Sequence, residues 1–310
     1  MTGMKISRLQ EAQWEEASVL IFASLDRYFT KTLNQPPIQG GPENMHFFPE
    51  IYEALDPGRC VTATCEESSH LAGLCFYHPR KSHFGLGIMA VHPDFGGRGV
   101  ARTILSEIIK LAQKEALPIR LVSSAMNLES FSLYTKAGFV PQESFHDLQI
   151  TIPKNGLTIS PPEGCQQVRS ATREDIPAMV ALEKELVGIE RAKDYLFFLE
   201  NEGEIWHSLI TESPDGTITG FLCSIDHPDM CMLGPGVSRD EETLLALLYQ
   251  ELTTRGGQSP IVLIPTKAAR VVQTLYQWSG RNTEIHLSQV LGKSQEVTGF
   301  TVPTFMPESG

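Results

Sequence analysis

Apolar and polar residues in the first half of the chain follow the repeats of a mixed α/β protein. Val61, Ala63 and Cys65 alternate with polar residues, which predicts a strand with one buried face. Residues 100–111 place apolar side chains on one helical face, and residues 86–91 are almost continuously apolar, as in a central strand. The same patterns predict strands at 5–9, 71–77, 119–123 and 145–152, and helices at 11–29 and 128–137.

The second half of the chain repeats this order of elements. The predicted elements are strands at 206–212, 217–225 and 261–264, and helices at 244–252 and 268–278. Leu133–Gly138 matches Leu275–Gly280, and each segment follows a strand that begins after a proline. A duplication explains the repeat most simply, with Tyr276 as the counterpart of Tyr134.

Residues 154–167 separate the two halves. This segment contains two glycines and two prolines, which predicts a linker. A chain of 310 residues is too long for one ordinary core and fits two domains of roughly 150 residues. We therefore expect one domain at 1–153 and a second at 168–310.

Composition and charge limit the kinds of partner and cellular location that we expect for the protein. The net charge of −12 argues against a nucleic-acid partner and weakly favours a cationic substrate such as an amine. No apolar run approaches the roughly 20 residues of a membrane span, and the first residues lack a signal-peptide stretch. The six cysteines include no C-x-x-C pair, so we expect free, buried thiols in a cytoplasmic protein and no metal site.

A glycine-rich turn between the strand at 86–91 and the helix from residue 100 gives the clearest indication of a binding site. Unpaired backbone N–H groups at a helix N-terminus attract anions, and glycines let the backbone approach one closely. Gly96–Ala101 therefore predicts a pyrophosphate cradle. The spacing matches neither the dinucleotide fingerprint nor the nucleoside-triphosphate loop. The competing explanation is a tight strand–helix turn without a ligand.

This turn resembles the first signature of the GNAT N-acetyltransferase superfamily, [Q/R]-x-x-G-x-[G/A] at the start of a long helix. Gly99 and Ala101 match the pattern, whereas Gly96 replaces the leading Gln or Arg. In the family, backbone N–H groups make most contacts to the pyrophosphate, so the resemblance implies that the cradle survives. Arg98 or Arg102 is a candidate to compensate for the missing side chain.

Residues 127–141 resemble the second signature of the same family, N-x-x-x-x-x-L-Y-x-K-x-G-F. By position, Asn127 would hold the pantetheine arm, and Tyr134 would protonate the departing thiolate. A tyrosine has a pKa near 10, close to that of an alkyl thiol. The plainer alternatives are a helix cap for Asn127 and core packing for Tyr134.

The resemblance implies an α/β (α+β) GNAT fold, a mixed central sheet flanked by helices, in two tandem copies. It implies an acetyl-CoA-dependent N-acetyltransferase that acts on a primary amine by direct attack. The expected cofactor-binding residues are Met89, Ala90, Val91, Gly96, Gly97, Arg98, Gly99, Val100, Ala101 and Asn127, with Tyr134 as the catalytic acid. The general base stays open among Glu53, His83, His92 and Asp94.

The counterpart of the cradle in the second half, residues 237–243, has no glycine and three consecutive carboxylates. Such charges repel a pyrophosphate, so we expect a degenerate copy that does not bind the cofactor. Two other functions compete with catalysis: a non-catalytic acyl-CoA-binding regulatory module and a purely structural pair. The acceptor is a small molecule or a peptide, and the protein is a monomer or a homodimer.

Overall fold

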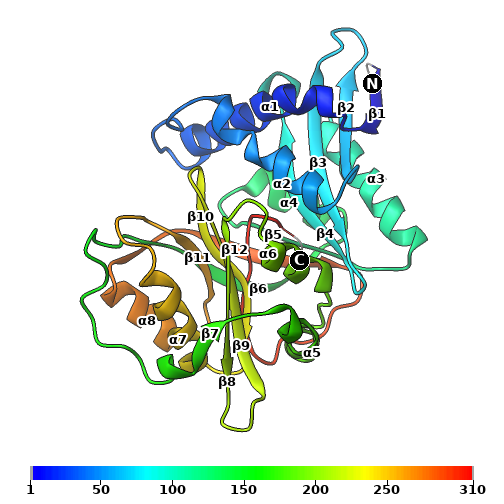
Figure 1. Cartoon of the computed structure of the whole chain (residues 1–310). Helices are drawn as coiled ribbons and strands as arrows, with labels where there is room; N and C mark the ends of the chain where they lie inside the picture. Colours follow the sequence, from blue (N-terminus) through cyan, green and yellow to red (C-terminus); the bar gives the residue numbers. More distant parts are fainter. Residues whose placement is uncertain (1–2, 309–310) are drawn as a thin grey trace. The chain divides into compact units, whose positions relative to one another are not determined.

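The computed structural model describes residues 3–308 and divides the chain into two units (Figure 1). Unit 1 comprises the residues up to Val140, the segment Gln289–Gly292 and the residues from Pro307 onward. Unit 2 comprises Pro141–Ser288 and Lys293–Met306. Each unit is a mixed sheet with helices on both faces, which confirms the predicted fold class.

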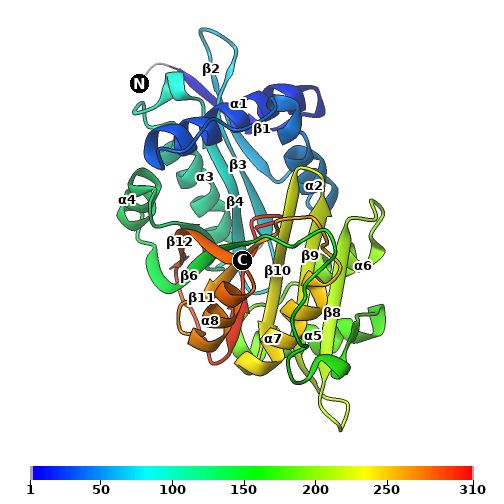
Figure 2. The same ribbon diagram turned by 90° about the vertical axis from the view of Figure 1, so that its left-hand side faces the viewer.

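Unit 1 is built on five strands in the order β1-β2-β3-β4-β5. The first four are antiparallel, and β5 is parallel to β4. Figure 2 shows α2 and α3 on opposite sides of β3 and β4. The strands are β1 Met4–Arg8, β2 Cys60–Cys65, β3 Leu71–Pro79, β4 Phe84–Val91 and β5 Ile119–Ser124, and the helices are α1 Trp14–Arg27, α2 Phe47–Leu55, α3 Val100–Lys114 and α4 Leu128–Lys136.

The core of unit 1 forms where the apolar face of α3 meets the sheet. Val100, Ile104 and Ile108 recur every three or four residues, so one helical face buries all three against β2, β3 and β4. Gly73 on β3 faces this helix, and a Cβ there would lie 2.7 Å from Val100 Cγ1. Burying each of these aliphatic side chains contributes about 1.5–3 kcal/mol, so α3 and its N-terminal turn are held firmly on β4.

Unit 2 repeats the arrangement with strands in the order β7-β8-β9-β10-β11. The helices α7 and α8 cover one face, and α5 and α6 cover the other (Figures 1 and 2). The strands are β7 Val168–Ser170, β8 Trp206–Glu212, β9 Ile218–His227, β10 Met230–Ser238, β11 Ile261–Pro265, β12 Gly280–Leu291 and β13 Phe300–Val302, and the helices are α5 Ile176–Val187, α6 Ala192–Glu200, α7 Glu241–Leu252 and α8 Ala269–Gln277.

The strand β6, Val140–Ile150, follows α4 in sequence but pairs with β11 of the second half, antiparallel from Phe145 to Gln149. In return, Gln289–Gly292 at the end of β12 belongs to unit 1, where Gln289 Nε2 donates to Ser123 Oγ on β5 at 2.9 Å. Each unit therefore contains a strand segment from the other half of the chain. The domain limits at 153 and 168 stay a prediction.

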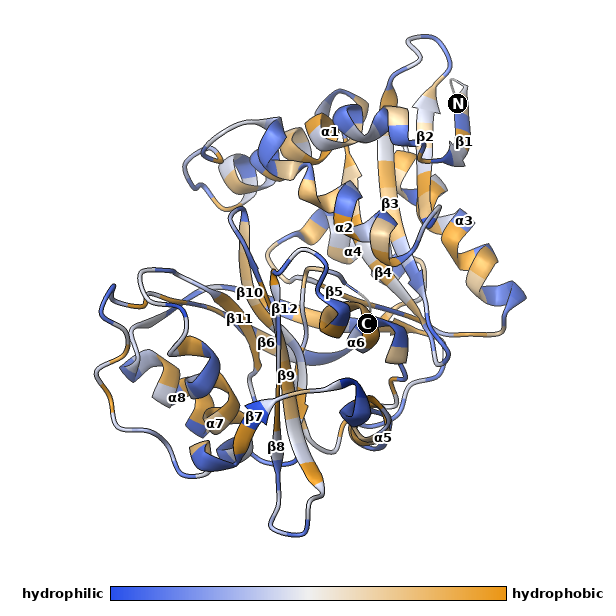
Figure 3. Ribbon diagram, viewed as in Figure 1, coloured by the Kyte–Doolittle hydropathy of each residue, from blue (hydrophilic) through white to orange (hydrophobic). Residues whose placement is uncertain are grey.

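The predicted strands and helices are present with shifts of a few residues at their ends. Apolar residues gather on the strands and on the inner sides of the helices, and the hairpin tips are hydrophilic (Figure 3). The elements that we did not predict include α2, α6, β7, β10, β12 and β13. Within residues 3–308, no helix combines the length and the apolar character that crossing a bilayer requires.

Candidate functional site

The turn between β4 and α3 has the backbone of an anion cradle. After β4 ends at Val91, one short 3-10 turn, Pro93–Phe95, leads to Gly97 and Gly99, whose φ angles are +73° and +81°. Side chains disfavour such angles, so both positions require glycine for conformation. A Cβ at either residue would meet no atom within 4 Å, so this side of the turn is open to a ligand.

Gly99 is the N-cap of α3 and has no side chain to cap the helix. In the described part of the chain, no protein acceptor is found for the N–H groups of Gly99, Val100 and Ala101. The helix dipole adds positive potential at the same point. Arg98 is exposed, and its guanidinium lies 5.4 Å from the centre of the Phe95 ring. These groups can bind an anion at the start of α3.

Gly96 differs from the other glycines of this turn. Its φ of −55° and ψ of 143° are open to any residue, and its added Cβ would lie 3.1 Å from the Pro93 carbonyl oxygen. Its conformation therefore does not require glycine. The departure from the family pattern removes a side chain but leaves the backbone of the cradle in place.

The strands β4 and β5 pair only at their beginnings. Phe84 pairs with Ile119 and Gly85 with Arg120, and within residues 3–308 no pairing joins the two strands beyond these positions. Met89, Ala90 and Val91 lie on the part of β4 that β5 does not pair with. Their edge of β4 can hydrogen-bond an extended ligand that leads away from the cradle.

Tyr134 lies on α4 with 7% of its surface exposed, and its ring centre is 5.6 Å from that of Phe139. Burial raises the pKa of its hydroxyl well above the usual value, and electrostatic interactions with Cys75 and Glu308 raise it further. Tyr134 is therefore protonated at neutral pH and can serve as a proton donor.

Glu308, near the C-terminus, is the functional candidate that the sequence patterns missed. The Tyr52 hydroxyl on α2 donates to Glu308 Oε2 at 3.5 Å, and the Ile88 backbone on β4 also lies within hydrogen-bonding reach of that hydroxyl. Burial raises the pKa of the Glu308 carboxyl well above its usual value. No motif or periodicity surrounds Glu308, so no sequence signal could have identified it.

The four base candidates from the sequence are engaged in local contacts. Glu53 accepts from the Gly58 N–H at 2.7 Å, and His83 Nδ1 lies 2.9 Å from Ser82 Oγ. His92 Nδ1 lies 3.7 Å from the Asp94 carboxylate. Glu308 lies beside Tyr52 and the central strand, so it joins these four residues as a candidate base.

Asn127 is the N-cap of α4, and its Oδ1 accepts from the Ser130 N–H at 3.1 Å. This confirms the capping role that the sequence left open. The hydrogen bond occupies Oδ1, while the amide group still offers N–H donors. A contact between Asn127 and a pantetheine arm therefore stays a prediction.

The second half lacks the cradle because its own carboxylates cap the helix. The Asp240 side chain accepts from the Thr243 N–H at 2.8 Å at the start of α7. Glu241 accepts from the Arg270 N–H at 2.9 Å at the start of α8. Asp240 thus occupies an N–H group at the start of α7 that could bind an anion, and both acids repel a second negative charge.

The predicted match between Tyr134 and Tyr276 is wrong by one residue. The helices α4 and α8 begin at Leu128 and Ala269, a shift of 141, which pairs Tyr134 with Leu275. Leu275 is fully buried, whereas Tyr276 is 46% exposed. Gly138 and Ser279, with φ of +99° and +67°, end the two helices at the same shift. The second copy therefore has no counterpart of the buried tyrosine.

Comparisons with known proteins agree with this geometry. The acetyltransferase (GNAT) family matches residues 22–139, which contain the cradle and Tyr134. No curated protein sequence matches the chain significantly. A putative acetyltransferase from Pyrococcus horikoshii has a similar structure, with a TM-score of 0.76 and 16% identity over 99% of this chain and 96% of that one.

Two further solved structures extend the similarity over both halves. A tandem GNAT protein from the clavulanic acid biosynthesis pathway has a TM-score of 0.61 and 12% identity over 94% of this chain and 100% of that one. N-myristoyltransferase from Saccharomyces cerevisiae has a TM-score of 0.57 and 10% identity over 100% and 84%. These identities show the fold alone. Residues 22–139 thus form a domain of the acetyltransferase (GNAT) family, and the chain as a whole shares the fold of tandem GNAT structures.

Proposed function

We propose that the protein is an acetyl-CoA-dependent N-acetyltransferase whose site lies in unit 1. The observation that carries this proposal is the set of unpaired N–H groups at the start of α3, beside strands that diverge. GNAT-family membership supports acyl transfer in general. The fold is shared with a protein solved with myristoyl-CoA, which supports a coenzyme A thioester as the donor.

In this proposal, the N–H groups of Gly97, Gly99, Val100 and Ala101 bind the pyrophosphate of the coenzyme. Arg98 adds a positive charge at the mouth of the cradle. The free edge of β4 from Met89 to Val91 binds the pantetheine arm as an additional strand would, and Asn127 contacts the same arm. The thioester then lies near the centre of β4, next to Ile88.

The reaction needs one proton acceptor and one proton donor. The neutral amine nitrogen attacks the thioester carbonyl carbon, the C–S bond breaks, and the products are an amide and a free thiol. Glu308 accepts the proton that the amine loses, and Tyr134 gives a proton to the thiolate sulfur. Burial raises the proton affinity of the thiolate as well as that of Tyr134, so the transfer stays nearly balanced.

A non-catalytic acyl-CoA-binding module is the second candidate. The observation that favours it is Gly96, which supplies no side chain to the pyrophosphate where the family pattern has Gln or Arg. Both candidates predict coenzyme binding. Only the enzyme predicts release of free thiol when an amine is present.

The test measures thiol release from acetyl-CoA with a panel of primary amines, small molecules and peptides. We expect Tyr134→Phe to lower kcat by about 100-fold or more with little change in the affinity for acetyl-CoA. Tyr276→Phe is the matched control, because Tyr276 is an exposed tyrosine at the same turn of α8. Coenzyme binding without thiol release for any amine would favour the binding module. Equal rates for Tyr134→Phe and Tyr276→Phe would exclude Tyr134 as the acid.

A further inference from the structure

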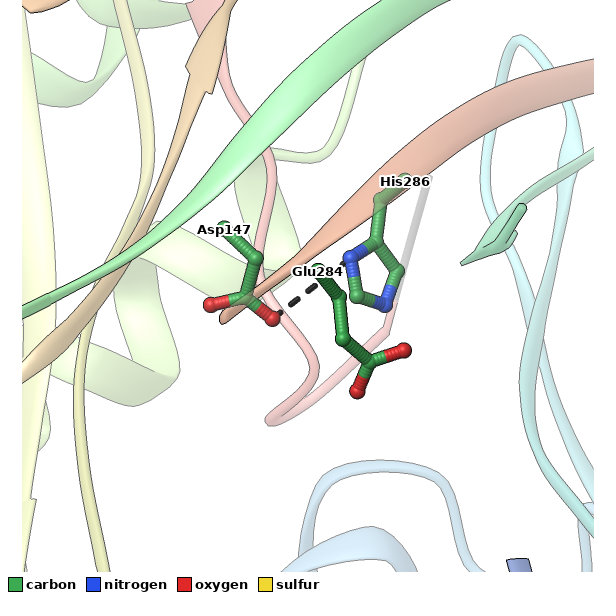
Figure 4. Close-up of side chains that lie close together, drawn as sticks. All are labelled: Asp147, Glu284 and His286. Carbon is green, nitrogen blue, oxygen red and sulfur yellow. Dashed lines mark ion pairs between the residues drawn. The ribbon is translucent and has the colours of Figure 1, made fainter. Parts of the chain in front are cut away.

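Three side chains in unit 2 form a cluster outside the proposed acyl-transfer site. Asp147 lies on β6, and Glu284 and His286 lie on the neighbouring strand β12. Residues two apart on a strand share a face, so Glu284 and His286 project together. Figure 4 shows the three side chains turned toward one another, and one ligand atom from each lies within 4.8 Å of the other two.

The backbone around this cluster is fixed by hydrogen bonds between the two strands. Thr283 Oγ1 donates to the Asp147 carbonyl oxygen at 3.2 Å. The side chains of His146 and Asn282 join the same strands with a contact of 2.9 Å between Nδ1 and Oδ1. The strands therefore hold Asp147 opposite Glu284 and His286 without help from the three side chains themselves.

The polar atoms of the cluster are buried and incompletely paired. Asp147 and His286 are each 5% exposed, and neither Asp147 Oδ1 nor His286 Nδ1 has a hydrogen-bond partner. The contact between Asp147 Oδ2 and His286 Nδ1 measures 3.5 Å, which is long for a hydrogen bond. In the described chain, the ion pair found for Asp147 is with His286 and not with a lysine or an arginine. A buried carboxylate beside a second carboxylate is unfavourable unless a cation compensates it.

We propose that Asp147, Glu284 and His286 bind one divalent metal ion of the zinc class, in contrast to the expectation of no metal site that the cysteine pattern gave. Two carboxylates and one neutral imidazole balance a charge of +2, and imidazole nitrogen with carboxylate oxygen is a donor set that zinc accepts. Asp147 Oδ2 and His286 Nδ1, which face each other in Figure 4, would then become ligands. The Phe305 ring lies 4.8 Å from the His286 ring and covers it on one side. The inference stands apart from the proposed acyl transfer, because all three ligands belong to unit 2.

The experiment uses the full chain without an affinity tag, stripped of metal with a chelator. Isothermal titration with Zn²⁺ should give one site per chain, and Co²⁺ at the same site should give visible absorption bands. Asp147→Asn and His286→Gln should each weaken Zn²⁺ binding by more than the 10–100-fold that loss of an outer-shell partner causes. Each should also remove the rise in melting temperature that Zn²⁺ produces in the native protein.

Two controls separate this site from other zinc ligands. His227→Gln changes the histidine of another His–Asp pair in unit 2, in which His227 Nδ1 lies 3.8 Å from Asp229 Oδ2, and should bind Zn²⁺ normally. Cys231→Ser removes a half-buried thiol and should also leave the titration unchanged. Loss of the zinc effect in Cys231→Ser would overturn the proposed ligand set.

Folding defects are separated from lost binding by the metal-free proteins. Asp147→Asn keeps the side-chain volume and removes one of two neighbouring buried charges, so without metal it should melt at or above the native temperature. A folded Asp147→Asn protein that binds Zn²⁺ as tightly as the native chain would overturn the proposal. So would a native chain that binds neither Zn²⁺ nor Co²⁺, since the two carboxylates would then share a proton instead.

Discussion

The hydroxyl of Tyr52 on α2 lies 3.5 Å from the carboxylate of Glu308, 256 positions later in the chain. The backbone of Ile88 on β4 lies within reach of the same hydroxyl. A carboxylate from the end of the sequence thus stands beside the central strand of unit 1. In the proposed reaction, this is where the attacking amine loses its proton.

Replacing Glu308 tests this assignment. We expect Glu308→Gln to lower kcat by about 10²–10⁴-fold with little change in acetyl-CoA binding, because the amide cannot accept a proton. Glu296→Gln is the matched control, since Glu296 is exposed and lies in the same C-terminal region. Steady-state thiol release measures both variants, and equal activity for the two would exclude Glu308 as the base.

The raised pKa of Glu308 also predicts the pH dependence of the reaction. The base must be ionised to act, so kcat/KM should rise with pH through a pKa above the usual range of carboxylates. That limb of the pH profile should flatten in Glu308→Gln. An unchanged profile would assign the titrating group to another residue.

The packing of α3 predicts a large loss of stability for a cavity in the core of unit 1. Ile104 is fully buried between α3 and the sheet. Ile104→Ala should lower the free energy of unfolding by about 2–5 kcal/mol, measured by urea denaturation. Leu128 on α4 is exposed, and Leu128→Ala should change stability by less than about 0.5 kcal/mol. Similar losses for the two variants would contradict the assignment of the core.

Arg191 and Glu183 form a buried ion pair, so we expect the stability of unit 2 to depend strongly on both side chains. Arg191 Nη2 lies 2.5 Å from Glu183 Oε1, and both side chains are almost fully buried. Glu183→Gln should lower the free energy of unfolding by about 3–5 kcal/mol, because it removes the carboxylate that forms the closest ion pair with a buried guanidinium. Arg239 and Glu185 form an exposed pair at the same distance, and Glu185→Gln should cost about 0–1 kcal/mol.

The start of α5 predicts an acid-sensitive contact in unit 2. Hydrogen bonds from Arg169 lower the pKa of Asp175 to about 2, and Asp175 Oδ2 also accepts from the Thr172 N–H. Because the pKa is lower in the folded than in the unfolded chain, the ionised carboxylate stabilises the fold at pH values above about 3.9. This stabilisation is lost as the pH falls through about 2. Asp175→Asn should therefore reduce stability at pH 7 and flatten its decline between about pH 4 and pH 2. Denaturation curves across that pH range test whether stability falls with acid as predicted.

The glycine turn before α3 and the burial of Tyr134 could be predicted from the sequence because both depend on local order. A strand, a glycine turn and an amphipathic helix are contiguous in residues 86–111, so their geometry follows from neighbouring residues. The alignment of Tyr134 with Tyr276 failed because the residue identities match at one shift between the two halves, whereas the helix starts match at a shift that differs by one residue. Burial of Leu275 reveals the true register.

The remaining features depend on residues far apart in the chain. Glu308 and Tyr52 are 256 positions apart in the sequence, and Asp147 meets Glu284 and His286 through the pairing of β6 with β12. No periodicity indicates that β6 pairs with β11 of the second half. A single sequence offers no signal for such contacts, because strand pairing at long range leaves the local pattern unchanged.

Thermal unfolding with and without saturating acetyl-CoA tests the central claim, that Gly97–Ala101 bind the coenzyme. At about 100 times the dissociation constant, the ligand should stabilise the native chain by about 2.7 kcal/mol. Gly99→Glu should abolish the rise in melting temperature. Gly156→Glu should retain it, because Gly156 has nearly the same φ of +82° and equally open surroundings but lies outside the cradle. A rise of equal size in Gly99→Glu and the native chain, or no rise in the native chain, would contradict the account.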